Sequence, residues 1–321
     1  MARDRQGKDH DRGRHAATPG QIPRAGWKDI LSRVMAQVKA DNVPLLAAGL
    51  AYYAVLALFP AVIAAVTLYG LVADPAEIER QVSSFLTGLP EAGEIIQNQI
   101  RAATSSQRGL SIGALVSLLL ALYSASAGAN GIVRGINVVY DEEETRGFLK
   151  LRGLSLLLTV GALVTGLIAI GLVGVLPAII DSFGLGRIGE TVVRVVRWPA
   201  LALLAVAGLG LLYRYAPNRQ AAKVRWVTWG AITATALWLI GSGLFSLYIS
   251  NFSNYGATYG TVAGIIILLL WLFLSSFALL LGAEINAEME RQTRRDSTTG
   301  PEQPLGSRGA RAADTVGKSA S

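Results

Sequence analysis

The chain of 321 residues contains no cysteine and only two histidines, and 16% of its residues are charged. The absence of cysteine excludes disulfides, thiol catalysis, cysteine-ligated zinc and iron–sulfur clusters. Both histidines, His10 and His15, lie in the polar N-terminal segment. This position excludes a buried histidine base and a histidine metal cluster. We therefore expect neither a metal nor another cofactor.

The shortage of charge indicates a membrane protein, because soluble domains usually carry about 25% charged residues. The charges concentrate in the first 44 and last 36 residues, and 52% of the chain is hydrophobic. The fold class that we expect is all-α, a polytopic membrane helical bundle with six transmembrane helices, since a span needs roughly 20 mostly apolar residues. The six apolar stretches are 45–72, 110–133, 153–177, 198–213, 226–249 and 258–283.

Basic residues predict the orientation, because Lys and Arg concentrate in cytoplasmic loops. With six spans and the N-terminus inside, 23 of the 29 Lys and Arg residues are cytoplasmic and 6 are outside. If stretch 198–213 did not cross, the split would be 13 against 16. We therefore predict a multi-pass protein of the bacterial cytoplasmic membrane, with both termini cytoplasmic and no cleavable signal peptide. The net charge of +7 follows from this topology, so membrane lipids, and no nucleic acid, are the expected partners.

Composition divides the chain into three parts. Residues 1–25 and 291–321 are charged and rich in Gly, Pro or Thr, which predicts disordered cytoplasmic tails. Residues 26–290 form the predicted membrane domain. Its longest connection, 73–108, has the apolar periodicity of two short amphipathic outer-loop helices.

An amphipathic helix is also predicted just before the first span. It is either an interfacial helix on the inner leaflet or a helix packed on the cytoplasmic ends of the bundle. Asp41, Asn42 and Pro44 are typical of a helix stop followed by a restart. The apolar residues at helical spacing are Trp27, Ile30, Leu31, Val34 and Val38.

Two spans carry small residues at a spacing of four, which lets a second helix approach closely. We expect these two spans to pack on each other. In the first span, Pro60 removes a backbone hydrogen bond and predicts a kink facing the bundle interior. The small residues are Gly113, Ser117, Ala121 and Ala125 in one span, and Gly256, Gly260 and Gly264 in the other.

The spans contain few ionisable groups. Glu284 closes the last span, where an ionisable side chain is costly unless it is paired or hydrated. It is either a functional residue or a hydrated anchor beside Arg291 or Arg134. Hydroxyl and amide groups elsewhere in the spans either bridge helices or line a polar path. The residues that we predict along a substrate path are Tyr52, Tyr53, Ser126, Asn130, Tyr259, Glu284 and Asn286.

An acidic run occupies residues 141–144, next to Arg146. We interpret it as a solvated cluster at a helix end rather than a metal or acid–base site. No second acidic cluster at helical spacing completes a two-metal site, so we predict no catalytic residue.

Several further blocks occur in a fixed order: 47–53 with Phe59 and Pro60, 124–126 running to Asn137 and Tyr140, 144–146, 213–217, Gly230 and Ala231 with Trp238, Phe245 with Tyr248, and Tyr259 and Gly260 through Trp271 to 282–284 with Asn286. In order and spacing they resemble the YihY/BrkB family of bacterial inner-membrane proteins. The resemblance covers about residues 27–290 and leaves out both tails.

This resemblance implies a six-helix inner-membrane protein. Members are linked to serum resistance or to the export of lipids or lipid-linked material, and an older ribonuclease BN label is regarded as a misassignment. The chain offers no paired carboxylates or histidines to activate a water on a phosphodiester.

We therefore expect a non-enzymatic transporter of a lipid or another amphipathic solute. The first alternative is a membrane scaffold that recruits envelope proteins through its acidic loop and basic tails, and the last is a membrane-bound ribonuclease. A homo-oligomer is compatible with each.

Overall fold

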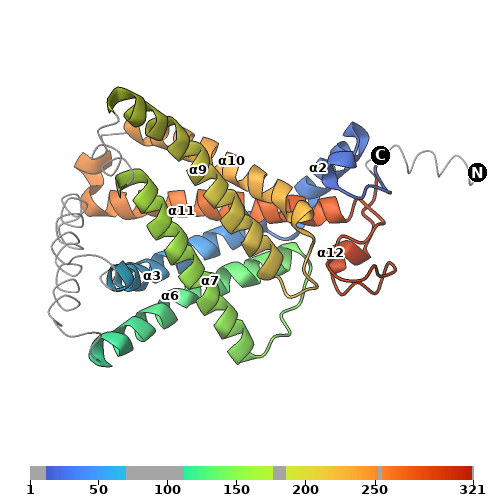
Figure 1. Ribbon diagram of the computed structural model, residues 1–321, viewed down its shortest axis with the longest axis horizontal. Coiled ribbons are helices and arrows are strands. Elements are labelled where there is room, and N and C mark those ends of the chain that lie inside the picture. The colour runs from blue at the N-terminus through green and yellow to red at the C-terminus, as the bar shows by residue number, and fades with distance from the viewer. Residues whose placement is uncertain (1–11, 70–111, 176–185, 252–254, 320–321) are drawn as a thin grey trace, which may run out of the picture. The chain divides into compact units, whose positions relative to one another are not determined.

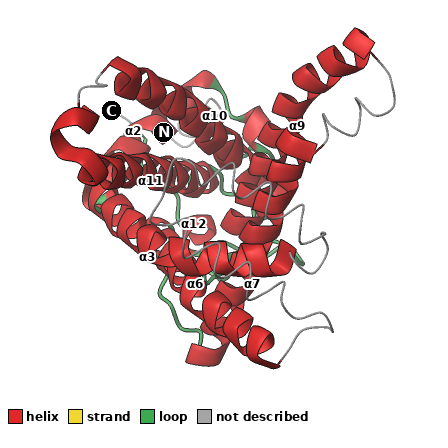
Figure 2. Cartoon of the chain, turned by 90° about the vertical axis from the view of Figure 1, so that its left-hand side faces the viewer, coloured by secondary structure: helices red, strands yellow, loops and turns green. Residues whose placement is uncertain are grey.

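The computed structural model describes residues 12–69, 112–175, 186–251 and 255–319, which form helices and their connections (Figures 1 and 2). Apart from helices, the described residues form one isolated antiparallel bridge, between Ala222 and Thr298. The all-α fold class is confirmed. The elements are η1 (Pro19–Gln21), α2 (Arg24–Ala40), α3 (Val43–Tyr69), α6 (Ile112–Val139), α7 (Phe148–Ile170), the π-helical η2 (Gly171–Val175), α9 (Gly186–Tyr215), α10 (Val224–Asn251), α11 (Tyr255–Glu290) and α12 (Arg311–Asp314).

Each of the six predicted spans falls on one of these helices, because a helix satisfies its own backbone groups in hydrocarbon. The bent pair Arg24–Ala40 and Val43–Leu58 is also long and apolar enough to cross a membrane as one broken span. The count of six is compatible with these helices and stays a prediction. The predicted outer-loop helices in 73–108 lie outside the described residues. Among the described residues, four helical segments are by themselves long and apolar enough to cross a membrane: Phe148–Val173, Val195–Tyr215, Val224–Ser250 and Gly264–Glu290.

The break predicted at Asp41 and Asn42 is confirmed, since α2 and the first part of α3 meet there at 63°. Asn42 has a φ of +51°, and Asn is one of the few residues that adopts this left-handed conformation at a helix C-terminus. Pro60 lies within α3, which continues past it to Tyr69. The sharp bend therefore lies at the start of α3, and the kink at Pro60 stays a prediction.

Helix α2 packs against α11. Ile30 and Val34 are buried, and Trp27 lies 6.0 Å from Trp229 of α10, measured between ring centroids. Of the two interpretations of this helix, the structure supports packing on the bundle. Leu31 is 52% exposed, so the apolar face is divided between the protein and its surroundings.

The chain divides into two compact units. Unit 1 comprises Met1–Tyr52, Gly131–Lys150 and Val195–Ser321, and unit 2 comprises Tyr53–Asn130 and Leu151–Arg194. All of α2, α10, α11 and α12 belong to unit 1. Unit 2 contains most of α7 and large parts of α3 and α6.

In unit 2 the small residues of α6 lie against α3. Ala121 and Leu118 are buried with Ala64 of α3. A Cβ added at Gly128 would lie 3.0 Å from the Cβ of Ala57. Ala125 is also buried. Close approach of a helix along the whole row stays a prediction. Gly113 and Ser117 lie on α6, but their side-chain surroundings are outside the described part of the chain.

In unit 1, α10 and α11 run side by side (Figure 1). Two indole N–H groups bridge them: Trp238 donates to the Ser275 hydroxyl at 3.0 Å, and Trp271 donates to the Ser242 hydroxyl at 3.2 Å. These hydroxyls join helices, which was one of their two predicted roles.

The tight glycine contact of α11 differs from the one predicted. A Cβ added at Gly264 would meet no atom within 4 Å, whereas a Cβ at Gly282 would lie within 3.0 Å of the Gly230 carbonyl oxygen on α10. Gly256 and Gly260 lie on α11 where side-chain surroundings are not described. Mutual packing of the two glycine-containing spans stays a prediction.

The prediction of disordered tails is wrong for residues 12–25 and 291–319. The Thr293 hydroxyl donates to the Ala16 carbonyl at 2.7 Å, and the Arg294 amide donates to the Arg14 carbonyl at 2.8 Å. The guanidinium of buried Arg308 donates to the carbonyls of Arg294 and Ala313. The polar composition of the tails predicted disorder. In the structure, polar side chains of the tails donate hydrogen bonds to backbone carbonyls of distant segments, which allows those carbonyls to be buried.

Candidate functional site

Glu284 is the most unusual polar residue of unit 1. It lies on α11 and has no exposed area. Neither carboxylate oxygen has a hydrogen-bond partner within the described residues. Burying a carboxylate without a partner is costly. A hydrated anchor, one of the two predicted roles, does not fit a side chain that no solvent reaches.

Of the two cations expected beside Glu284, Arg134 is exposed, and Arg291 makes its hydrogen bonds elsewhere. Its guanidinium donates to the Glu288 and Asp141 carboxylates. Glu288 also accepts a hydrogen bond from Arg33 of α2. Arg33 in turn donates to the Gln292 side chain at 2.8 Å. The two guanidinium groups thus tie α2, α11 and the segment after α6 together through carboxylates other than Glu284.

Four carboxylates form what we call the carboxylate cluster: Asp41, Asp141, Glu284 and Glu288. The charges of Asp41, Glu288, Arg291 and Asp141 all act on Glu284. With two guanidinium groups against four carboxylates, the cluster carries an excess of negative charge when every group is ionised.

Helix C-termini position two members of the cluster. Asp141 follows α6 with a φ of +56°; its amide donates to the Val138 carbonyl at 2.9 Å, and the Glu142 amide donates to the Asn137 carbonyl at 2.8 Å. This is the Schellman arrangement, which satisfies the last carbonyls of a helix. Asp41 caps the C-terminus of α2, where its amide donates to the Gln37 carbonyl at 2.8 Å. Helix C-termini carry partial negative charge, so both aspartates add charge where the potential is already negative.

Burial is the main cause that raises the pKa of Asp41 to about 6, and the nearby Asp141 carboxylate raises it further. Arg291 acts in the opposite direction. One oxygen of Asp41, Oδ2, is buried and lacks a hydrogen-bond partner among the described residues. Asp41 and Glu284 are therefore the two cluster members with unsatisfied oxygens.

A second buried network lies one turn further along α11. Arg219 donates to Glu290 Oε2 at 2.6 Å, and the Ser297 hydroxyl donates to the same oxygen at 2.6 Å. The Arg219 guanidinium carbon also lies 4.9 Å from the centroid of the Tyr140 ring, a cation–π contact. Burial raises the pKa of Tyr140. Ser297 belongs to the C-terminal tail, so the tail contributes directly to the buried polar groups of unit 1.

The acidic run 141–144 is less solvated than its sequence predicts. Glu144 binds the Arg146 guanidinium and accepts a hydrogen bond from Asn137 at 2.9 Å. The Arg146 side chain lowers the pKa of Glu144. The Glu142 carboxylate accepts a hydrogen bond from the backbone amide of Arg311 in α12 at 2.7 Å. Glu143 is exposed, as expected of a solvated residue.

The structure gives Asn286 a packing role. Its side-chain oxygen accepts a hydrogen bond from the Gly230 amide at 2.8 Å, and its side-chain nitrogen donates to the Val227 carbonyl at 3.2 Å. Both partners lie on α10. The amide therefore joins two helices, although it lies only two residues from Glu284.

The other predicted path residues are divided between the units. Tyr52 belongs to unit 1, and Tyr53, Ser126 and Asn130 belong to unit 2. Tyr52 and Tyr53 are 58% and 46% exposed, whereas Ser126 is buried and donates to the Tyr123 carbonyl at 2.7 Å. Tyr259 lies on α11 where side chains are not described. A continuous path stays a prediction.

Sequence reasoning missed Asp41, Glu288, Arg33 and Arg219 as members of a buried polar site. One signal was present, because Glu284 and Glu288 are four residues apart and thus on one face of a helix. The other members come from distant segments, and no spacing rule connects them. Among the described residues, no three His, Asp or Glu side chains are arranged to hold a metal ion.

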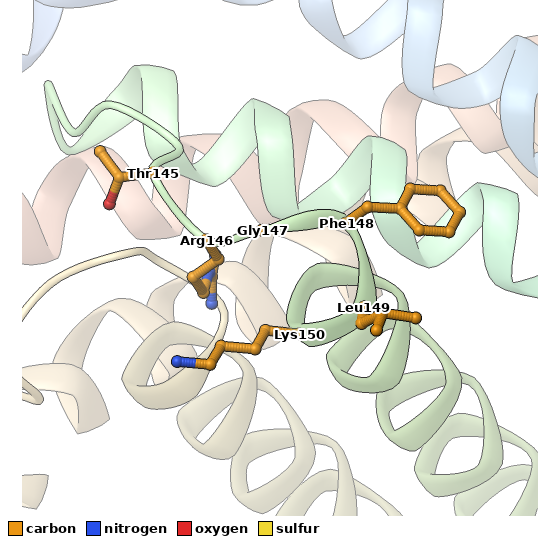
Figure 3. Close-up of a pocket in the computed structure, with 6 residues that line it drawn as sticks. All are labelled: Thr145, Arg146, Gly147, Phe148, Leu149 and Lys150. Atoms are coloured by element: carbon orange, nitrogen blue, oxygen red, sulfur yellow. The ribbon is translucent and has the colours of Figure 1, made fainter.

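An open hollow of about 570 Å³ lies at the start of α7 (Figure 3). Phe148 and Leu149 beside it are 71% and 83% exposed. Six consecutive residues line it, so it is the surface of one turn rather than a site to which several elements contribute. Its lining residues are Thr145, Arg146, Gly147, Phe148, Leu149 and Lys150.

Comparison with known proteins agrees with the resemblance seen in the sequence. A family model described as virulence factor BrkB matches residues 34–306. The ribonuclease-like protein YfkH of Bacillus subtilis is 36% identical over 255 residues, covering 77% of this chain and 90% of YfkH. The UPF0761 membrane protein IL2447 of Idiomarina loihiensis is 27% identical over 279 residues, covering 82% and 94%. A UPF0761 membrane protein of Psychromonas ingrahamii is 27% identical over 260 residues, covering 78% and 84%. No solved structure matches.

Proposed function

Because this chain is an integral membrane protein that belongs to the virulence factor BrkB family, we propose that it moves a lipid or another amphipathic solute across the bacterial cytoplasmic membrane. Both termini lie on the cytoplasmic side in this proposal, as the distribution of Lys and Arg predicts. The protein acts by binding and moving a molecule rather than by transforming it.

The observation that carries this proposal is the buried carboxylate of Glu284. It follows a long apolar run of α11 and has no hydrogen-bond partner among the described residues. An ionisable group within a membrane span is expensive, and such groups commonly mark a substrate or ion pathway. The neighbouring Asn286, in contrast, makes hydrogen bonds to α10, so packing accounts for it.

The remaining polar groups of the proposed path are uncharged. Tyr52 and Tyr53 offer half-exposed rings with hydroxyl groups, which suit a molecule with both apolar and polar parts. In α6, Asn130 carries a further amide group, whereas Ser126 is buried and its hydroxyl donates to the Tyr123 carbonyl. A weakly charged path favours an amphipathic solute over a small inorganic ion, because an ion needs closely spaced ligands or charges.

A scaffold that recruits proteins through its acidic loop and basic tails is the weaker alternative. Glu142 and Glu144 already accept hydrogen bonds from Arg311 and Arg146. Arg308, in the C-terminal tail, is buried and bonded to backbone carbonyls. Groups that are engaged within the chain are less available to a partner.

A nuclease activity rests on the name of one relative, YfkH. The carboxylates that could take part in such a reaction are Asp141 and Glu142, which contact Arg291 and Arg311. Cleavage of RNA by the purified protein, lost when Asp141 and Glu142 are replaced by Asn and Gln, would support this activity and contradict the non-enzymatic proposal.

Reconstitution into liposomes tests the transport proposal. Labelled phospholipids and labelled amphipathic anions are offered on one side, and movement is compared with protein-free vesicles. We expect the wild-type protein to move at least one class of probe and Glu284→Gln to move it at least tenfold more slowly at equal protein content. Glu143→Gln, which changes an exposed glutamate, is the matched control. Absence of movement for every probe would contradict the proposal.

A further inference from the structure

The negative charge around Glu284 exceeds the positive charge that the structure supplies. Three helices, α2, α6 and α11, end beside the carboxylate cluster, and each C-terminus adds partial negative charge. Asp41 follows α2, Asp141 follows α6, and Glu288 lies on the last turn of α11. The Tyr140 hydroxyl lies in the same neighbourhood and interacts with Glu284.

Among the described residues, the two arginines that contact the cluster are bonded to carboxylates other than Glu284. Arg291 binds Glu288 and Asp141, and Arg33 binds Glu288. This pairing leaves Glu284 and Asp41 with buried oxygens that accept no hydrogen bond from the described residues. Protonation is the simplest change that removes the cost of a buried carboxylate without a partner.

We infer that Glu284 is a proton-binding site, that it exchanges its proton with water through Asp41, and that this exchange drives the proposed transport. The coupling rests on the transport role proposed above. In the chemical step, a proton leaves water or the Asp41 carboxyl group and binds a carboxylate oxygen of Glu284, and it returns the same way. No other covalent bond changes.

The position of Arg291 shows how the proton can act on the fold. Glu284 and Glu288 lie on α11, and Arg291 directly follows its last residue, where its amide still donates to the Ala287 carbonyl. The three are spaced by four and three residues, so they share one face. An ionised Glu284 competes with Asp141 for Arg291. Loss of the Arg291–Asp141 contact releases α11 from the segment after α6. Proton binding favours the contact seen in the structure, and proton release weakens it.

Infrared spectroscopy tests the proton site without a transported substrate. The full-length protein is purified in lipid nanodiscs, and the carbonyl stretching band of protonated carboxyl groups is recorded at neutral pH in H2O and D2O. We expect a band that shifts in D2O, that is lost in Glu284→Gln and that persists in Glu143→Gln. Absence of the band from the wild-type protein, or its persistence in Glu284→Gln, would overturn the proton site.

A second variant keeps the test valid if Glu284→Gln does not fold. Asp41→Asn removes the proposed proton donor and leaves Glu284 in place. We expect the band to remain and its hydrogen–deuterium exchange to slow at least tenfold. An unchanged exchange rate would overturn the role of Asp41.

The coupling is tested in proteoliposomes with and without an imposed pH difference. We expect a pH difference to change the rate of probe movement at least fivefold. Movement that ignores the pH difference would overturn the coupling and leave the transport role standing. If the infrared band is present but no probe moves, the transport role and its coupling fail together while the proton site stands.

Discussion

Gly230 of α10 and Gly282 of α11 face each other so closely that a Cβ on either would lie within 3.0 Å of the other's carbonyl oxygen. The Gly230 amide donates to the Asn286 side chain in the same contact, and the Tyr213 hydroxyl donates to the Leu279 carbonyl nearby, at 2.7 Å. This close crossing fixes the part of α11 that carries Glu284.

Replacing Gly282 by Ala should therefore destabilise the protein. The added methyl group would meet the Gly230 carbonyl oxygen, the Tyr213 hydroxyl and the Ala234 methyl group. Overpacking of this kind costs about 1 to 3 kcal/mol. Thermal unfolding of the purified variant in detergent, followed by size-exclusion chromatography, measures the effect.

Gly264→Ala on the same helix is the control for this prediction, since a Cβ there meets nothing within 4 Å. It should be neutral, or stabilising by less than about 1 kcal/mol, because Ala is the better helix former. Equal unfolding temperatures for the two variants would show that the glycine contact does not matter.

Asn286→Ala should lower stability rather than change any substrate preference. The variant loses hydrogen bonds to the Gly230 amide and the Val227 carbonyl. We expect a loss of about 1 to 3 kcal/mol, seen as a lower unfolding temperature and a lower membrane level. If the variant has wild-type stability but moves the probes at a different rate, the result would support the predicted role of Asn286 in the substrate path instead.

The C-terminal tail should resist limited proteolysis. Arg308 is buried, and its guanidinium donates to the carbonyls of Arg294 and Ala313. Trypsin should therefore cleave after Arg308 slowly, because cleavage requires local opening. Arg308→Ala should expose the tail to faster cleavage after Arg294 and Arg311, with fragments identified by mass spectrometry.

Glu302→Ala changes an exposed residue of the same tail and should leave the cleavage rates unchanged. Cleavage after Arg308 of the wild-type protein as fast as in an unfolded peptide would contradict the folded tail.

Asp41 should make stability depend on pH. Burial raises its pKa to about 6 in the folded protein, against an ordinary value of 3.8. The folded state therefore binds more protons than the unfolded state between these values, so the contribution of Asp41 to stability decreases as the pH rises from about 4 to about 6. Asp41→Asn removes this dependence.

Unfolding temperatures of the variant and the wild type, measured at intervals from pH about 4 to about 7.5, test this sign. The variant should gain stability relative to the wild type as the pH rises through about 6. A difference that stays constant, or that changes in the opposite direction, would show that Asp41 is not protonated preferentially in the folded state.

The periodicity of the sequence was sufficient to place the helices. The described parts of the six apolar stretches lie on helices, and Asp41 and Asn42 mark the observed break. These features depend on local sequence. The length of an apolar run decides whether a helix can span the membrane, and a residue that favours the left-handed conformation ends a helix at its own position. Glu284 could be singled out for the same reason, as an ionisable group at the end of an apolar run.

The surroundings of Glu284 could not be predicted in this way. Asp41, Asp141 and Arg33 come from segments that are far from α11 in the sequence. The contacts of the tails could not be predicted either, because their polar composition is typical of disordered segments. In the structure, Thr293 and Arg308 donate hydrogen bonds to backbone carbonyls of other segments. Whether a polar side chain finds such a carbonyl depends on which segments lie next to each other in the fold.

By itself, the sequence determined a helical membrane protein and the cost of burying Glu284, because hydrophobic length and charge are properties of local composition. The order and spacing of its sequence blocks indicated the family. Only the tertiary structure decided that Arg291 binds Glu288 and Asp141 and leaves Glu284 without a partner among the described residues. The physical reason is that pairing depends on distance and direction in space. An arginine with several carboxylates within reach binds those that the folded backbone places in line with its N–H groups.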